Sequence, residues 1–74
     1  MKYVRIRSYY QDGRFTTCEH AYGGDNQVKA LERFNREFPE HHDCIKVAET
    51  IDDKDEEWQE WFRVARNCGC VHFF

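Results

Sequence analysis

Long apolar runs are absent from this sequence. No stretch approaches the roughly 20 consecutive apolar residues that a membrane-spanning helix needs, so we expect no membrane partner. Internal repeats, low-complexity tracts and linkers are also missing, and only four Gly and one Pro break up regular structure. The 74 residues contain 41% hydrophobic and 34% charged side chains, which is the composition of a single small globular domain over residues 1–74.

The sequence also lacks the motifs that carry common enzyme chemistry. It contains no glycine-rich phosphate loop, no HExxH and no GxSxG. Cys18 and His20 stand two residues apart on one predicted strand, but no third group is present to orient the histidine as a base. We therefore predict that the protein is not an enzyme and has no catalytic residues.

A secretory signal is missing too, because Lys2, Arg5 and Arg7 interrupt any apolar segment near the start. Without an export signal, the four cysteines are expected to be reduced thiols in a cytoplasm. In a secreted chain, four cysteines would allow two disulfides.

Aromatic residues, by contrast, are abundant at 16% of the chain. Large rings bury much surface each and help a short chain to build a core. A domain of this size is close to the lower limit of stability. It therefore needs efficient aromatic packing, a metal or disulfide, or a partner chain.

The first part of the sequence predicts a β-hairpin. Alternating side chains and β-forming residues indicate a strand over residues 2–10, and the Asp12-Gly13 turn leads into a return strand over about residues 14–22. Two registers are possible. A two-residue loop pairs Ile6 with Glu19, whereas a three-residue loop with a glycine bulge pairs Ile6 with Cys18. We prefer the second register, because it buries the thiol and also pairs Arg5 with Glu19.

A helix and a third strand follow the hairpin. Residues 25–38 have apolar side chains at helical spacing, with Asp25 or Asn26 as the N-cap and Pro39 as the stop. A strand is predicted over residues 44–51. Its inward-facing side chains are expected to be Ile45 and Val47.

Two interpretations of the C-terminal part stay open. Trp58, Trp61, Phe62 and Ala65 recur at the spacing of an amphipathic helix, and a short strand over residues 70–74 follows. The acidic start and basic end of this segment suit the helix dipole. The alternative is a hairpin with strands at residues 61–66 and 70–74. We prefer the helix.

Together these elements predict an α+β domain of order ββαβαβ. The expected packing has two layers, in which a mostly antiparallel sheet of three to four strands carries both helices on one face.

Charge is distributed unevenly around a net value of −3. Residues 1–38 carry seven basic and five acidic side chains, whereas residues 39–74 carry four basic and nine acidic ones. A mildly acidic chain is unsuited to general coating of nucleic acid. A dense array of carboxylates, however, can occupy the basic surface of a partner protein. The predicted partner-binding residues are Asp52, Asp53, Asp55, Glu56, Glu57 and Glu60.

A second candidate surface lies on one face of the first strand, where Tyr3, Arg5, Arg7 and Tyr9 alternate. Aromatic and Arg side chains on an open sheet bind single-stranded nucleic acid, and they are also enriched at protein interfaces.

Zinc is the one cofactor that the residue types suggest, because thiolate and imidazole are its preferred ligands. The common C-x₂₋₄-C spacing is missing, so we predict no cofactor and no metal. The weaker zinc candidates are His42, Cys44, Cys68, Cys70 and His72.

In size, acidity and plan the chain resembles the small proteins of phages and other mobile elements, and anti-CRISPR proteins in particular. The resemblance rests on the single domain, the hairpin over residues 2–22, the helix over residues 25–38 and the acidic segment at residues 49–60. It implies a non-catalytic inhibitor that binds a nucleic-acid-handling complex, in the host-cell cytoplasm if a phage encodes the protein. No diagnostic motif matches, so no functional residue carries over.

The sequence therefore predicts a small cytoplasmic inhibitor or adaptor that occupies a partner protein's basic surface. One alternative is a zinc-stapled module that binds nucleic acid through the Tyr/Arg strand face. The other is a homodimeric accessory protein whose open sheet face self-associates.

Overall fold

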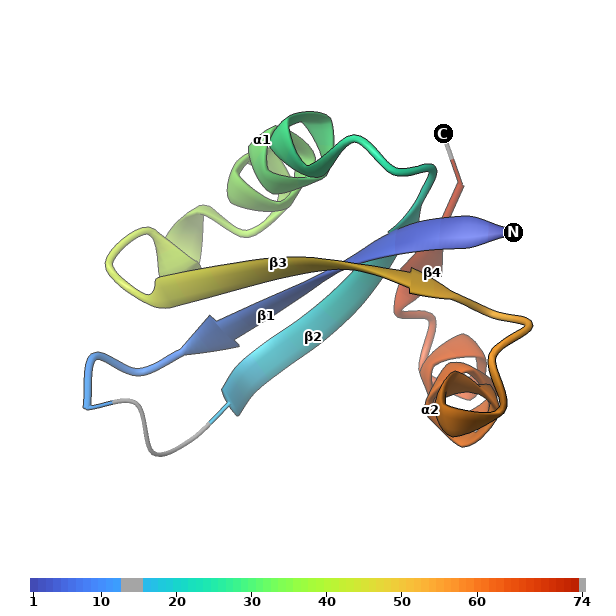
Figure 1. The fold of residues 1–74 in the computed structure, drawn as a ribbon. Coiled ribbons are helices and arrows are strands. Elements are labelled where there is room, and N and C mark those ends of the chain that lie inside the picture. The colour runs from blue at the N-terminus through green and yellow to red at the C-terminus, as the bar shows by residue number, and fades with distance from the viewer. Residues whose placement is uncertain (13–15, 74) are drawn as a thin grey trace.

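The computed structural model describes residues 1–12 and 16–73. Within these residues, four strands and two α-helices follow one another in the predicted order ββαβαβ (Figure 1). A short 3-10 helix, η1, covers Pro39–His41. The elements are β1 (Lys2–Tyr9), β2 (Thr16–Gly23), α1 (Gln27–Glu37), β3 (Ile45–Asp52), α2 (Glu56–Asn67) and β4 (Val71–His72). The α+β class is thus confirmed, as is the helix in the C-terminal part.

The strands form one sheet in the order β3-β1-β2-β4. β1 lies between β2 and β3 and is antiparallel to both, whereas the two-residue β4 pairs with β2 in parallel. The sheet is therefore mostly antiparallel, as predicted. None of the helices in the described residues is long and apolar enough to cross a membrane.

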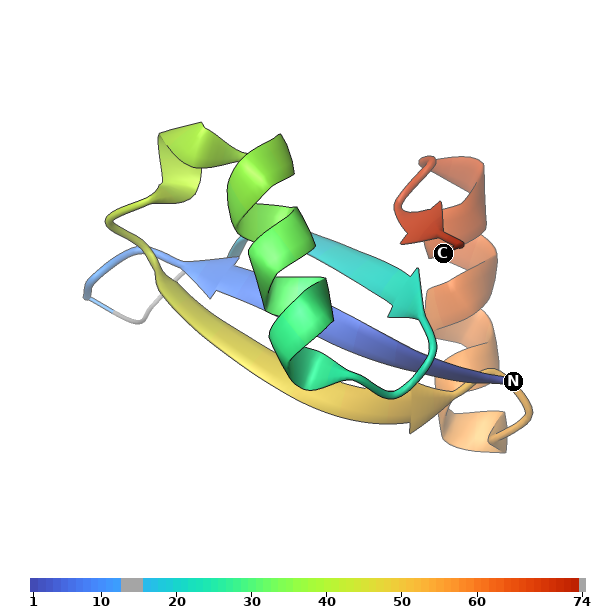
Figure 2. The same ribbon diagram turned by 90° about the horizontal axis from the view of Figure 1, so that it is seen from above.

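The prediction that both helices cover one face of the sheet is wrong. Val4 and Ile6 of β1 pack with Phe34 of α1, whereas Tyr3 packs with Phe62 of α2. Since neighbouring strand residues point to opposite faces, the helices cover opposite faces, as Figure 1 shows. Seen from above in Figure 2, α1 lies over the sheet and α2 lies farther from the viewer, beside the end that holds the N terminus.

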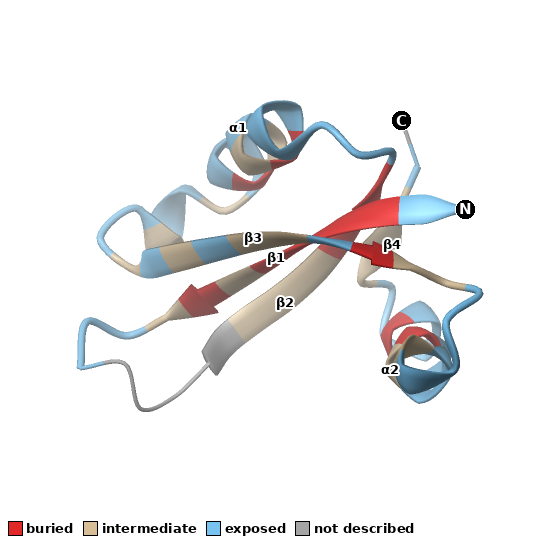
Figure 3. Cartoon of the chain, viewed as in Figure 1, coloured by how far each residue is buried: buried red, intermediate tan, exposed pale blue. Residues whose placement is uncertain are grey.

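The reason lies in β1, which is buried on both sides. Its residues from Tyr3 to Ile6 are all buried, and Figure 3 shows the buried positions concentrated there and on the sides of the helices that face the sheet. A strand whose two faces both carry large side chains needs a covering layer on each. The sheet therefore lies between two helices, and two small cores replace the single core expected.

The start and end of α1 follow local rules. The Asn26 side chain accepts a hydrogen bond from the backbone N–H of Lys29 at 3.0 Å, which selects Asn26 as the N-cap of the two candidates. Pro39 begins η1 directly after the helix. Val28, by contrast, has the apolar spacing of the helix and is nevertheless 67% exposed.

Neither predicted hairpin register is correct. Ile6 pairs with His20 and Ser8 with Cys18, and the register shifts between Ser8 and Tyr9. This pairing differs from the preferred prediction by two residues, so the side chains keep their faces. Cys18 packs against the α1 core as expected. The loop contains more residues than either predicted turn, and Gly13 lies outside the described residues.

The side chains predicted to face inward on β3 are exposed, Ile45 at 47% and Val47 at 39%. They pair with Tyr9 and Arg7, at the end of the sheet opposite to α2 in Figure 1. The core instead receives Ile51, which is buried, and Ala48, which packs against the α1 core. The side chains of β3 are thus buried only where a helix covers that part of the sheet.

Candidate protein-binding surface

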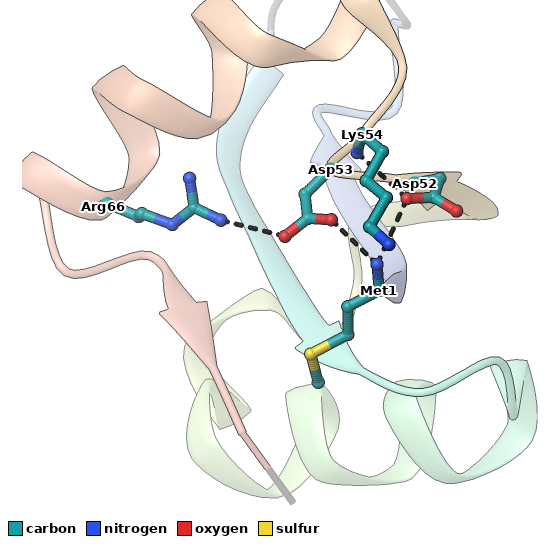
Figure 4. Close-up of polar contacts among 5 residues, drawn as sticks. All are labelled: Met1, Asp52, Asp53, Lys54 and Arg66. Atoms are coloured by element: carbon teal, nitrogen blue, oxygen red, sulfur yellow. Dashed lines mark hydrogen bonds and ion pairs between the residues drawn. The ribbon is translucent and has the colours of Figure 1, made fainter.

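The predicted acidic residues surround the turn between β3 and α2. Asp52 and Asp53 bind the N-terminal ammonium of Met1, with N···O distances of 3.3 Å and 2.9 Å (Figure 4). Asp53 also pairs with Arg66 of α2 at 3.2 Å. The backbone N–H of Lys54 donates to Asp52 at 2.9 Å. These two carboxylates therefore join the chain start to α2.

The same contacts shift the pKa of Asp52 and that of the Met1 ammonium. The hydrogen bond from the backbone of Lys54 is the largest influence on Asp52 and, with the nearby ammonium, lowers the pKa of this carboxyl below its ordinary value. The hydrogen bond to Asp53 likewise raises the pKa of the Met1 ammonium. Asp52 and Asp53 thus both have their cationic partners inside the chain.

Glu60 also has a partner within the chain. It forms an ion pair with Arg63, one turn further along α2, and the Nε of Arg63 donates to it at 3.1 Å. The hydrogen bond from Arg63 lowers the pKa of Glu60. Three of the six predicted contact residues are therefore already neutralised by intramolecular pairs.

The other three, Asp55, Glu56 and Glu57, are exposed. In residues 1–12 and 16–73, no ion pair or side-chain hydrogen bond involves their carboxylates, and Asp55 occupies the N-cap of α2 without a capping bond from its side chain. The N-terminal end of the helix dipole favours negative charge at this place. We call these three residues the acidic patch.

The second candidate surface is not open, which corrects the prediction. Tyr3 is 1% and Arg5 6% exposed, because α2 covers them. The guanidinium of Arg5 lies 4.4 Å from the ring centroid of Trp58 and 5.3 Å from that of Trp61. Its Nε donates to Glu49 on β3 at 2.7 Å.

Only Arg7 and Tyr9 of that strand face remain partly exposed. They contact each other, with the guanidinium 5.4 Å from the tyrosine ring centroid. Of the two rings and two arginines of the predicted nucleic-acid surface, only one ring and one arginine are therefore accessible. The sequence signal for this burial was the pair Trp58 and Trp61, whose i, i+3 spacing places two large rings on one face of α2.

The zinc candidates do not converge. His42 and Cys44 lie between η1 and β3, whereas Cys68, Cys70 and His72 lie beyond or at the end of α2. In the part of the chain that the structure describes, no three His, Cys, Asp or Glu side chains are placed to hold a metal ion.

Comparison with known proteins does not add a family. No protein-family model, curated protein or solved structure matches this chain.

Sequence reasoning missed a pair of histidines. Nδ1 of His20 lies 2.8 Å from Nε2 of His72, which ties β4 to β2. The His72 ring also stacks on Tyr22 at 4.9 Å, and the His20 ring contacts Phe38 at 4.4 Å. The two histidines are far apart in the sequence, so no local pattern could have joined them.

This pair predicts a stability that depends on pH. Burial is the largest cause that lowers the pKa of both His20 and His72 from the ordinary 6.5. The neighbouring His72 and His41 lower the pKa of His20 further, and Arg33 lowers that of His72. Glu37 opposes the shift at both rings. The unfolded chain therefore binds more protons than the folded one as the pH falls through 6.5. We expect the free energy of unfolding to decrease from pH 7.5 toward pH 5.

Urea denaturation at several pH values would measure this dependence. His72→Gln should weaken it, whereas His42→Gln, a change at an exposed histidine, should leave it as in the unmodified chain. Equal pH dependence in all three proteins would show that the His20–His72 pair does not contribute.

Proposed function

We propose that the protein is a non-catalytic inhibitor or adaptor, of the anti-CRISPR type, that binds a basic, nucleic-acid-handling surface of a partner protein. The observation that carries this proposal is the acidic patch, Asp55, Glu56 and Glu57, whose three consecutive carboxylates are exposed and unpaired in the described residues. A binding partner with basic side chains would neutralise these three carboxylates, which have no cationic partner in the described residues.

The neighbouring pairs favour this patch as the contact site. Asp52 and Asp53 hold the turn through Met1 and Arg66, so the start of α2 is presented by a tethered turn. A preorganised charged surface loses less side-chain freedom on binding than a mobile one. Three close negative charges also steer a basic partner during encounter, and salt screens this attraction over about 8 Å at physiological ionic strength.

Direct binding of nucleic acid has less support. The chain has a net charge of −3, and the Arg5 side chain that would contact phosphates is buried beneath α2. Phosphate contacts need accessible cations. The proposal therefore places the basic groups on the partner and the acidic groups on this chain.

The test is affinity capture with the tagged protein from lysate of a candidate host, with and without nuclease. We expect a near-stoichiometric protein partner that survives nuclease. Replacing Asp55, Glu56 and Glu57 with lysine should abolish this capture, because the contact would become repulsive. Circular dichroism should change little, since in the described residues no side-chain hydrogen bond or ion pair involves these three carboxylates.

A matched control changes the net charge by the same amount elsewhere. Replacing Asp25, Glu32 and Asp43 with lysine alters three other exposed acids and should leave capture intact. The proposal fails if the variant of the acidic patch retains the partner at low salt. It also fails if nucleic acid is recovered and nuclease releases every bound protein.

A further inference from the structure

A thiol and an imidazole meet where η1 leads into β3. The Sγ atom of Cys44 lies 3.8 Å from Nδ1 of His41, and the backbone N–H of Cys44 donates to the carbonyl of His41 at 3.0 Å. On the other side of the ring, Nε2 of His41 is 4.0 Å from the carboxylate of Glu40. Thiol, imidazole and carboxylate therefore follow one another in a row.

The His41 imidazole lies beside two aromatic rings of the core between α1 and the sheet. Its ring centroid lies 6.3 Å from that of Phe34 and 6.2 Å from that of Phe38. The His41 side chain is only 21% exposed, whereas that of Glu40 is 63% exposed. Packing thus fixes the His41 imidazole, and the Glu40 carboxylate approaches it from the solvent side.

The cysteine opens into a pocket of about 430 Å³. Besides the three residues of the row, its lining includes a second carboxylate, Asp43, whose backbone carbonyl accepts a hydrogen bond from the Gln11 side chain at 3.1 Å. Glu40 and Asp43 give the pocket an acidic rim, which favours positively charged small molecules over negatively charged ones. The lining residues are Tyr10, Gln11, Glu40, His41, Asp43 and Cys44.

The other three cysteines lack this arrangement. Burial raises the pKa of the Cys18 thiol to about 11 and also raises the pKa of Cys70, so both are poorly ionised at neutral pH. Cys68 is exposed, and in the described residues no hydrogen bond joins it to an imidazole. It therefore serves as an internal reference for an ordinary accessible thiol.

We propose that Cys44 is a nucleophilic thiol that exchanges with small cationic disulfides, with His41 as its base and Glu40 as the positioning residue for the imidazole. This reactivity is independent of the acidic patch and of partner binding.

The exchange transfers one half of the disulfide to Cys44. Nδ1 of His41 takes the proton of the Cys44 thiol, and the thiolate attacks one sulfur of the disulfide. The disulfide's own S–S bond breaks as a bond forms between Cys44 and the attacked sulfur. The other half leaves as a thiolate and receives the proton from His41. Cys44 is oxidised to a mixed disulfide, and the released half is reduced to a thiol.

The experiment uses the full chain and cystamine, a dicationic disulfide, at pH 7. Intact mass and peptide mapping over time give the rate at each cysteine. We expect Cys44 to react at least about tenfold faster than Cys68, because general-base assistance commonly contributes about a hundredfold or more. Oxidised glutathione, which is anionic, should react with Cys44 more slowly than cystamine does, relative to the rates at Cys68.

Neighbouring histidines provide the matched control. His41→Asn should reduce the Cys44 rate to that of Cys68, whereas His42→Asn should leave it unchanged. Because His41 packs against two aromatic rings, Glu40→Gln supplies a second variant at an exposed position. It should slow Cys44 and weaken the preference for cystamine. The proposal is overturned if Cys68 reacts as fast as Cys44 in the unmodified chain, or if neither His41→Asn nor Glu40→Gln slows Cys44.

Discussion

Phe62→Ala is expected to lower the free energy of unfolding by about 3–5 kcal/mol, the usual loss when a buried aromatic ring is removed. The Phe62 side chain is fully buried, and its ring lies 5.0 Å from that of Tyr3 and 5.2 Å from that of Trp61. A domain of this length has a total stability of only about 4–11 kcal/mol. The variant should therefore be largely unfolded or close to it.

The measurement is urea denaturation followed by tryptophan fluorescence. Val64→Ala is the control on the same helix, because Val64 is 48% exposed and its truncation should change stability by no more than about 0.5 kcal/mol. Equal midpoints for the two variants would contradict the packing of α2 against the sheet. That result would indicate that the sheet face with Tyr3 is open to solvent, as the sequence predicted.

Arg5→Met is the second change with a large expected effect, a loss of about 3 kcal/mol in the free energy of unfolding. The substitution keeps much of the apolar stem but removes the charge between Trp58 and the carboxylate of Glu49. Breaking a buried pair costs about 3–5 kcal/mol, because one charge stays behind without its partner. The lower end applies, since the Glu49 side chain is 35% exposed and keeps a weaker ion pair with Arg7.

The double variant Arg5→Met with Glu49→Leu separates charge from packing. With no carboxylate left unpaired, it should recover much of the lost stability. Arg7→Met is the matched control, because Arg7 approaches the same carboxylate only to 3.8 Å and is 30% exposed, and it should cost at most about 1 kcal/mol. If the single and double variants are equally stable, the loss of the Arg5–Glu49 ion pair does not explain the lower stability of Arg5→Met.

Local features of the fold were predictable, because their causes lie within a few residues. Asn26 caps α1 through an N–H three residues away, and Pro39 stops the helix through its own ring. The amphipathic spacing of Trp58 and Phe62 favoured a helix over a hairpin, and the structure confirms the helix. These signals established the order of the elements.

The faces of the sheet were not predictable in the same way. Tyr3 and Arg5 have the polar character of an open face, and only the tertiary contact with two tryptophans makes burial of a guanidinium favourable. The hairpin register failed because the loop is longer than the Asp12-Gly13 turn alone suggests. The exposure of Ile45 likewise depends on how far along the sheet α2 extends.

The acidic segment shows the same limit at the level of the candidate site. Composition located the carboxylates, but the cation that engages Asp52 and Asp53 is the ammonium of Met1, at the other end of the sequence. Arg63 is close enough in the helix to be foreseen as the partner of Glu60. The sequence therefore identified the charge correctly but could not divide it into paired and unpaired groups.

The central position of β1 has a consequence for biosynthesis. Its residues Lys2 and Tyr3 pair with Asp52 and Ile51, and one of its faces is covered by α2, which comes later still. On a ribosome, β1 is therefore translated well before the segments that bury it. At about 5–20 residues per second, Tyr3 and its neighbours remain uncovered for seconds before α2 is made.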